Sequence, residues 1–304
     1  MLLRTFALDI CLLLLLVLPA GAAIIDSGDG AGNTSAPADD PGWASVGVRG
    51  GLTAIHIRNG WVLSANHVAV GPTTFDGIVY EAIPGSATRL ETREGTFADL
   101  KIWGVYPHPP LPDLTIRSST AQPNGEIIMI GHGRNRGAAT DTDNPVVWMP
   151  PPDPPNPPKA GYLWASGLTM RWGTNRIDGK WLPHPNDTVS WYAIFDEQGS
   201  GYTTDEAQAA VGDSGGAVFF KQGGSWELMG VMHTVSLWPG DPDFPDSGQQ
   251  FNSALYGNAT AVADLSAYRD QILDLTAVPE PGGGLMLLSG VAFLLVTGRG
   301  RLRY

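Results

Sequence analysis

Short apolar and β-branched runs, separated by turn-forming residues, follow one another along most of this chain. The pattern predicts strands at residues 43–48, 52–58, 61–64, 78–81, 100–106, 114–116 and 127–130. A second set of strands is predicted at residues 162–172, 189–195, 217–220 and 226–233. Many short strands without helical periodicity between them indicate an all-β sandwich or barrel.

Two other segments depart from this pattern. Residues 149–158 are mostly proline, which lacks the N–H that a sheet interior needs, so they predict a surface loop between two halves of the domain. A polyproline spacer or ligand is the alternative. Near the end, apolar side chains at helical spacing predict one helix that packs on the body: Val262, Leu265, Tyr268, Ile272 and Leu275.

Composition narrows the classes of function. Of the 304 residues, 43% are hydrophobic and 16% are charged, which allows a substantial core. The 39 glycines and 25 prolines favour turns over long helices. The formal net charge of −12 argues against nucleic-acid binding, which requires a basic surface, and disfavours adhesion to anionic membranes.

Residues 1–23 have the features of a secretory signal peptide. Arg4 is followed by an apolar run at residues 11–18 and by the small residues Ala20-Gly21-Ala22-Ala23. The apolar run is too short to span a membrane easily. The only cysteine, Cys11, lies in this segment. The processed protein would therefore have no disulfide, no cysteine nucleophile and no thiolate metal site.

The strongest chemical signal is Gly212-Asp213-Ser214-Gly215-Gly216, which precedes an apolar strand. A serine hydroxyl is a weak nucleophile unless a base takes its proton and the developing oxyanion is stabilised. Glycines allow a tight turn that points backbone N–H groups at one spot. The N–H groups of Gly212 and Ser214 are the candidates for that oxyanion hole. An ordinary glycine-rich turn is the alternative.

Two further residues can complete a catalytic set. His67 follows the apolar strand at residues 61–64, so an imidazole with a near-neutral pKa stands at the end of a rigid element. Asp113 leads a short apolar run and can hold the histidine tautomer. Asp99 has a similar local pattern and lies closer to His67 along the chain.

In order and motifs the chain resembles the trypsin-like serine proteases of the chymotrypsin fold. Ser64-Ala65-Asn66-His67 matches the family's histidine motif except at Asn66, and residues 212–216 match its serine motif throughout. Asp113-Leu114-Thr115-Ile116 matches the aspartate motif loosely, and residues 129–133 resemble a family strand. The resemblance covers residues 24–276 and implies two six-stranded antiparallel β-barrels with a C-terminal helix. It favours Asp113 over Asp99, by spacing.

The resemblance also suggests residues for specificity. In trypsin an aspartate six residues before the nucleophile binds basic side chains. Gln208 occupies that position here, so cleavage after Arg or Lys is not expected. Glu206 or Asp205 could take the role of that aspartate instead. His233 lies on the strand that would bind substrate. It could bind an acidic side chain, as in glutamyl endopeptidases, or be structural.

The same resemblance suggests a mode of activation. In animal members a newly freed N-terminal isoleucine pairs with the aspartate before the catalytic serine. Cleavage after Ala23 would expose Ile24, and its partner would be Asp213. Signal-peptide removal by signal peptidase would then be the activating step.

The tail at residues 277–304 resembles a PEP-CTERM sorting signal. Pro279-Glu280-Pro281 precedes an apolar segment at residues 285–296, and Arg299, Arg301 and Arg303 follow it. The arginines would stay on the cytoplasmic side during transient insertion in the inner membrane, before cleavage by an exosortase. A plain single-span anchor is the alternative. The signal implies export to the envelope, surface or extracellular matrix of a Gram-negative bacterium.

Together these features predict a secreted serine endopeptidase that acts on proteins or peptides and needs no cofactor or metal. Calcium could bind at Asp26 and Asp29 or at residues 241–246, but neither run has EF-hand spacing. A catalytically inactive binding protein on the same scaffold is the first alternative. An esterase is the second, although the Gly-x-Ser-x-Gly elbow is missing.

Overall fold

A computed structural model describes residues 23–120, 122–140, 160–181, 188–236 and 252–277. Residues 1–22 of the signal peptide expected at 1–23, the proline-rich segment at 149–158, and residues 278–304 of the sorting segment expected at 277–304 lie outside these ranges. Among the residues described, no helix combines the length and apolar character needed to cross a membrane.

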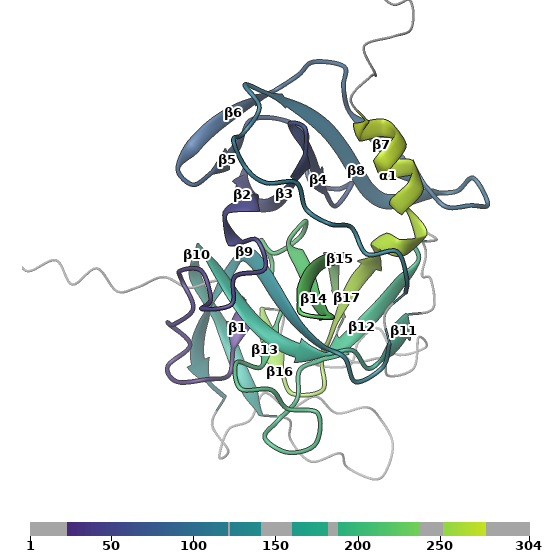
Figure 1. Ribbon diagram of the computed structural model, residues 1–304. Helices are drawn as coiled ribbons and strands as arrows, with labels where there is room; N and C mark the ends of the chain where they lie inside the picture. The colour runs from purple at the N-terminus through teal and green to yellow at the C-terminus, as the bar shows by residue number, and fades with distance from the viewer. Residues whose placement is uncertain (1–22, 121, 141–159, 182–187, 237–251, 278–304) are drawn as a thin grey trace, which may run out of the picture.

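The first half is a closed barrel (Figure 1). Its strand order is β4 (Trp61–Ser64), β3 (Leu52–Arg58), β2 (Val46–Arg49), β5 (Thr73–Phe75), β6 (Ile78–Ala82), β8 (Phe97–Tyr106) and β7 (Thr88–Glu91). Pairing of β4 with β8 closes six of these strands, and β7 lies outside the ring. A short 3-10 helix, η1 (Trp43–Ser45), occupies the start of the strand expected at 43–48.

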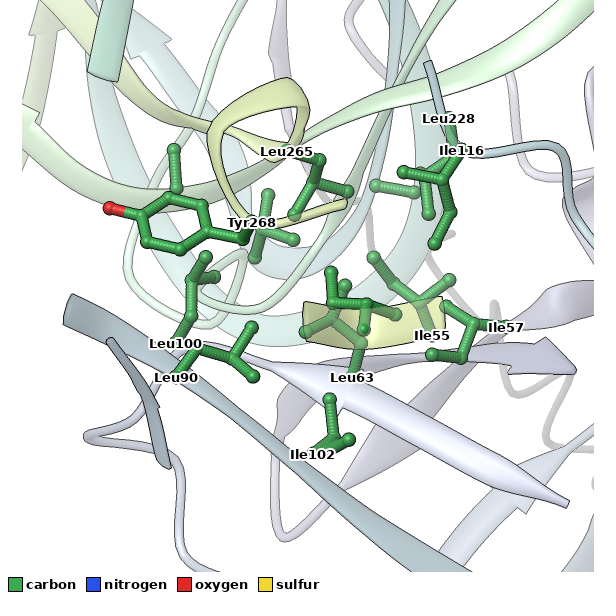
Figure 2. Close-up of a cluster of buried hydrophobic side chains, with 14 of the residues drawn as sticks. Ile55, Ile57, Leu63, Leu90, Leu100, Ile102, Ile116, Leu228, Leu265 and Tyr268 are labelled. Atoms are coloured by element: carbon green, nitrogen blue, oxygen red, sulfur yellow. The ribbon is translucent and has the colours of Figure 1, made fainter. Parts of the chain in front are cut away.

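In β3, β4 and β8 successive residues are buried, so both faces of these barrel strands are covered. Ala54, Val62 and Trp103 belong to one cluster shared by the barrel strands. Their neighbours Ile55 and Leu63 point the other way, because successive side chains of a strand alternate between faces. These two pack in a cluster that joins both halves of the molecule (Figure 2).

The second half is an eight-stranded sheet. Its order is β11 (Gly179–Trp181), β12 (Ser190–Ile194), β17 (Ala259–Asp264), β15 (Ser225–Ser236), β14 (Ala217–Gln222), β9 (Glu126–Ala139), β10 (Gly161–Arg176) and β16 (Ser253–Leu255). A separate two-stranded sheet joins β1 (Ile24–Ile25) to β13 (Ala207–Gln208). Within the described ranges no ladder closes the eight-stranded sheet into a ring. The prediction of two six-stranded antiparallel barrels is therefore confirmed for the first half, while the described strands of the second half form an eight-stranded sheet.

The helix expected to begin near Val262 starts later. Val262 lies in β17, which pairs on one side with β12 and on the other with β15, so ladder hydrogen bonds override the helical pattern. Asp264 then ends the strand, and its carboxylate accepts a hydrogen bond from Ser266 N–H at 3.0 Å at the start of η2 (Leu265–Ala267). The true α-helix, α1 (Arg269–Thr276), lies against the first half (Figure 1).

The segment between the halves makes no strand at 114–116. Ile116 forms a single bridge with Leu228 instead. Leu114 N–H donates to Ile57 O of the first half at 2.8 Å, and Arg117 N–H donates to Leu228 O of the second at 2.9 Å. This connection is thus bonded to both halves.

Candidate active site

Ser214 lies in a tight turn immediately before β14. Gly212 and Gly215 have φ angles of +107° and +87°, a region that favours glycine. A Cβ at Gly215 would lie 2.0 Å from Thr53 O, and one at Gly212 would lie 2.5 Å from His132 O. The glycines of the serine motif are therefore required by backbone conformation and by close approach of neighbouring backbone.

Thr53, a fully buried residue of β3, holds this turn in place. Its N–H donates to Ser214 O at 3.0 Å. Its hydroxyl donates to Gly212 O at 2.9 Å and accepts from His132 N–H at 2.8 Å. The sequence motifs do not point to Thr53. The available signal was a hydroxyl side chain early in a largely apolar strand.

His67 is held by Asp99. The backbone N–H of His67 donates to Asp99 Oδ1 at 3.1 Å, and its Nδ1 lies 2.9 Å from Asp99 Oδ2. A carboxylate oxygen accepts, so Nδ1 carries the proton and Nε2 of the neutral ring is left as a base. The hydrogen bond to Asp99 raises the pKa of His67, although burial opposes it. Burial alone would raise the pKa of Asp99, but hydrogen bonds from His233 and His67 bring it well below its usual range.

The structure corrects the expected role of Asp113. That carboxylate is half exposed and lies 3.6 Å from Arg58 in an ion pair, not beside His67. The reason is the register of the closed barrel: Ser64 of β4 pairs with Lys101 of β8, which brings the residues around the ends of these strands together. Asp99 is on β8 and His67 follows β4, so they meet directly.

The serine turn and the histidine loop adjoin each other. Ser64 Oγ donates to Thr53 O at 2.7 Å, and a Cβ at Gly215 would lie 2.1 Å from Ser64 Oγ. Gly215 directly follows Ser214, and Ser64 lies three residues before His67. The contact between Gly215 and Ser64 therefore brings the two candidate residues into the same region. Within the described residues, no hydrogen bond joins Ser214 Oγ to the His67 ring. Catalytic hydrogen bonds are often long in the absence of substrate.

The expected oxyanion-hole groups are free to donate. Neither Gly212 N–H nor Ser214 N–H donates a hydrogen bond inside the part of the chain that is described. The bond from Thr53 Oγ1 to Gly212 O fixes the orientation of the adjoining peptide.

Asp213 is fully buried, and burial raises its pKa to about 7. Ala210 N–H donates to its Oδ2 at 2.8 Å, and the N–H groups of Ala23 and Gly133 also face the carboxylate. Ile24 was the expected partner. It is buried in β1 opposite Gln208, and Ala23, one residue earlier, is the residue whose N–H reaches Asp213.

The expected specificity residues differ in burial and in hydrogen bonding. Gln208 is fully buried, and neither polar atom of its amide has a hydrogen-bond partner among the described residues. Glu206 is buried and accepts from Thr203, while Asp205 accepts from a serine hydroxyl, so their carboxylates are already engaged. His233 lies beside Asp99 and Ser190.

The described residues contain no group of three or more side chains placed to hold a metal ion. Of the suggested calcium ligands, Asp26 accepts hydrogen bonds from the hydroxyls of Tyr162 at 2.5 Å, Tyr202 at 2.8 Å and Tyr256. Residues 241–246 lie outside the described ranges.

Comparison with known proteins identifies a family. The family model described as Trypsin matches residues 30–255. The active form of the Rv3671c protease from M. tuberculosis is 15% identical, with 76% of each chain covered and a TM-score of 0.44. Kallikrein-related peptidase 10 is 14% identical, with 74% of this chain and 88% of that chain covered and a TM-score of 0.41. No curated protein matches this chain.

Proposed function

Because this chain belongs to the trypsin family, we propose that it is a serine endopeptidase with Ser214, His67 and Asp99 as its catalytic triad. The observation that carries the proposal is the double hydrogen bond from His67 to Asp99, next to a serine turn whose two N–H groups are unengaged. In this reading, Asp99 replaces Asp113.

The chemistry follows from the proton positions. Asp99 keeps the proton of His67 on Nδ1, so Nε2 accepts the proton of Ser214 as Oγ attacks a peptide carbonyl. The N–H groups of Gly212 and Ser214 stabilise the oxyanion that forms. His67 then returns the proton to the leaving amine, and water hydrolyses the acyl-enzyme by the same steps in reverse order.

A fluorophosphonate probe tests the proposal. It reacts with an activated serine, so wild-type protein should be labelled and Ser214→Ala protein should not. Absence of labelling in correctly folded wild-type protein would instead favour a binding protein on a protease scaffold. Hydrolysis of a mixed peptide library then tests endopeptidase activity.

We also propose that signal peptidase removes residues 1–22 and so exposes the amino group of Ala23. Small residues at Ala20 and Ala22 suit such cleavage. A cation at Ala23 would face the buried carboxylate of Asp213, where the Ala23 N–H already points. This shifts the expected mature terminus by one residue from Ile24. N-terminal sequencing of secreted protein that gives any residue other than Ala23 would refute it.

Export and sorting complete the proposal. The tail at residues 277–304 carries the Pro-Glu-Pro motif, apolar segment and arginines described above. We place the enzyme in the cell envelope or extracellular matrix after exosortase cleavage. A fusion of residues 277–304 to a secreted reporter should be cleaved near Glu280 only in a host with an exosortase.

A further inference from the structure

A groove of about 400 Å³ lies on the first half of the molecule, beside the end of α1. It is bounded by the turn between β3 and β4, the segment after β6, and β8. Its lining includes Trp61, Ile83, Gly104, His108, Thr276 and Ala277. The groups of the candidate active site do not line this groove, so it is a separate feature of the surface.

The groove is apolar and open. Ile83 is 40% exposed, although its side chain is entirely hydrocarbon. Gly104 of β8 has no side chain to fill the groove, and a Cβ there would lie 3.1 Å from Ile83 Cδ1. The ring of His108 packs against the backbone of Gly60 and leaves no room for a Cβ at that position. Exposed apolar surface that is gathered in one concave place favours a bound segment.

The end of α1 is fixed beside this groove. Asn59 and Gly60 form the turn between β3 and β4, with φ angles of +49° and +73°. The side chain of Asn59 donates from Nδ2 to Thr276 O at 3.0 Å. Thr276 is fully buried, and its hydroxyl donates to Ile272 O at 2.8 Å. The hairpin turn of the barrel therefore holds the last turn of α1 in place.

The residues that follow α1 start from the groove itself. Ala277 is exposed and lines the groove, and its φ and ψ angles of −59° and 134° are close to those of polyproline II. The next residues are Val278-Pro279-Glu280-Pro281. A residue that precedes proline disfavours the helical conformation, so this sequence favours continuing in polyproline II. Four residues then span about 12 Å.

We propose that residues 278–281 dock in this groove and hold the Pro-Glu-Pro motif against the folded domain. Val278 and the two prolines cover Ile83 and Trp61, since proline-rich segments bind grooves that have aromatic walls. The covalent connection to α1 gives the segment a high effective concentration at the groove. The chain's own segment is therefore favoured over a second copy or a separate peptide. This inference depends neither on catalysis nor on cleavage by an exosortase.

The test measures how fast a maleimide modifies single cysteines placed after α1. Cys11 is the only native cysteine, so the Cys11→Ser chain has no background reaction. Val278→Cys places a reporter in the docked segment, and Gly283→Cys places a matched reporter beyond it. The full chain is studied in detergent. A micelle around the apolar segment at residues 285–296 should protect position 283 more than position 278, whereas docking should do the opposite.

Two substitutions separate groove docking from other protection. Ile83→Asp removes an apolar wall and adds a charge that repels Glu280. Ile78→Asp is its control, because Ile78 is 56% exposed on β6 and does not line the groove. We expect Val278→Cys to react about tenfold more slowly than Gly283→Cys, since burial of one aliphatic side chain favours docking by at least about that factor. Ile83→Asp should make the two rates similar, and Ile78→Asp should leave their ratio unchanged.

Gly104→Val fills the groove with an apolar side chain and should release the segment by a second route. Thermal melts show which variants are folded, and either folded groove variant suffices for the test. Similar rates for the two reporters in the wild-type background would refute the inference, as would protection that survives in a folded groove variant. Protection that disappears on dilution would assign the groove to a second copy and would also overturn it. Fluorophosphonate labelling of the same samples tests the proposed function separately, and a failure there leaves the docking result unaffected.

Discussion

Replacing Thr53 by valine removes one hydroxyl and leaves the volume of the side chain almost unchanged. The lost group makes two hydrogen bonds, to Gly212 O at 2.9 Å and from His132 N–H at 2.8 Å. Thr53 is fully buried, so water cannot take over these bonds. An unpaired buried polar group costs about 1–3 kcal/mol. We therefore expect the free energy of unfolding to fall by about 2–4 kcal/mol.

The effect on catalysis should exceed this general loss of stability. Thr53 Oγ1 orients the carbonyl of Gly212, and Gly212 N–H is a proposed donor to the oxyanion. Deleting one such donor outright costs roughly 100- to 1000-fold in kcat. A displaced donor should cost less, so we expect kcat to fall about 10- to 100-fold. KM should change little, because the contact forms mainly in the transition state.

The assay combines urea unfolding with kcat and KM for a peptide substrate at a temperature where every variant is folded. Thr53→Ser keeps the hydroxyl and should retain most activity, with a loss of about 1 kcal/mol for the missing methyl group. Thr174→Val is the matched control, since the Thr174 hydroxyl is also buried and accepts from Asp205 N–H at 3.1 Å, away from the serine turn. Wild-type kcat in Thr53→Val, despite the expected loss of stability, would refute this account of the oxyanion hole.

Three further changes test other parts of the structure. Asp99→Asn should lower kcat by about 10⁴-fold, as expected when the histidine tautomer is lost, whereas Asp113→Asn should change peptide hydrolysis less than about twofold; equal losses would remove Asp99 from the triad. The raised pKa of Asp213, about 7, means that stability falls as pH rises from about 4 through 7 unless a cation faces the carboxylate. Protein that begins at Ala23 should therefore have a higher Tm at pH 8 than protein with one added N-terminal residue, and the difference should shrink at pH 5, as thermal melts at both pH values would show. Burial likewise raises the pKa of Glu206 to about 8, so the free energy of unfolding should decrease as pH rises from about 4.5 through 8. Glu206→Gln should flatten that pH dependence in urea titrations. An unchanged slope would show that Glu206 is ionised in the folded protein.

Local sequence was enough to single out the Ser214 turn and His67, which adjoin in the structure, but not the carboxylate that contacts His67. The turn at Ser214 needs glycines for its positive φ angles, and His67 follows a strand, Trp61–Ser64, that was predicted with its observed bounds. The choice of Asp99 depends on the pairing of Ser64 with Lys101, which closes the barrel. No local pattern around Asp113 or Asp99 reports that register.

The same limit applies to the second half. The helical spacing from Val262 onward was real for Leu265, Tyr268 and Ile272, which are buried together. Val262 nevertheless joined a strand, because partners on both sides offered ladder hydrogen bonds that a sequence window does not contain. Thr53 was missed for a related reason: its partners, Gly212 and His132, are distant along the chain.

The apolar cluster between the halves has a consequence for how the two halves can move relative to each other. Ile55 and Leu63 of the barrel share it with Leu228 and Leu265 of the other half (Figure 2). Separating the halves would expose this apolar cluster to water, at a free-energy cost of about 25 cal/mol for each Å² of apolar surface uncovered. The halves should therefore stay together, which keeps His67 and Asp99 of the first half beside the Ser214 turn of the second. They should remain associated even if the polypeptide is cut between them.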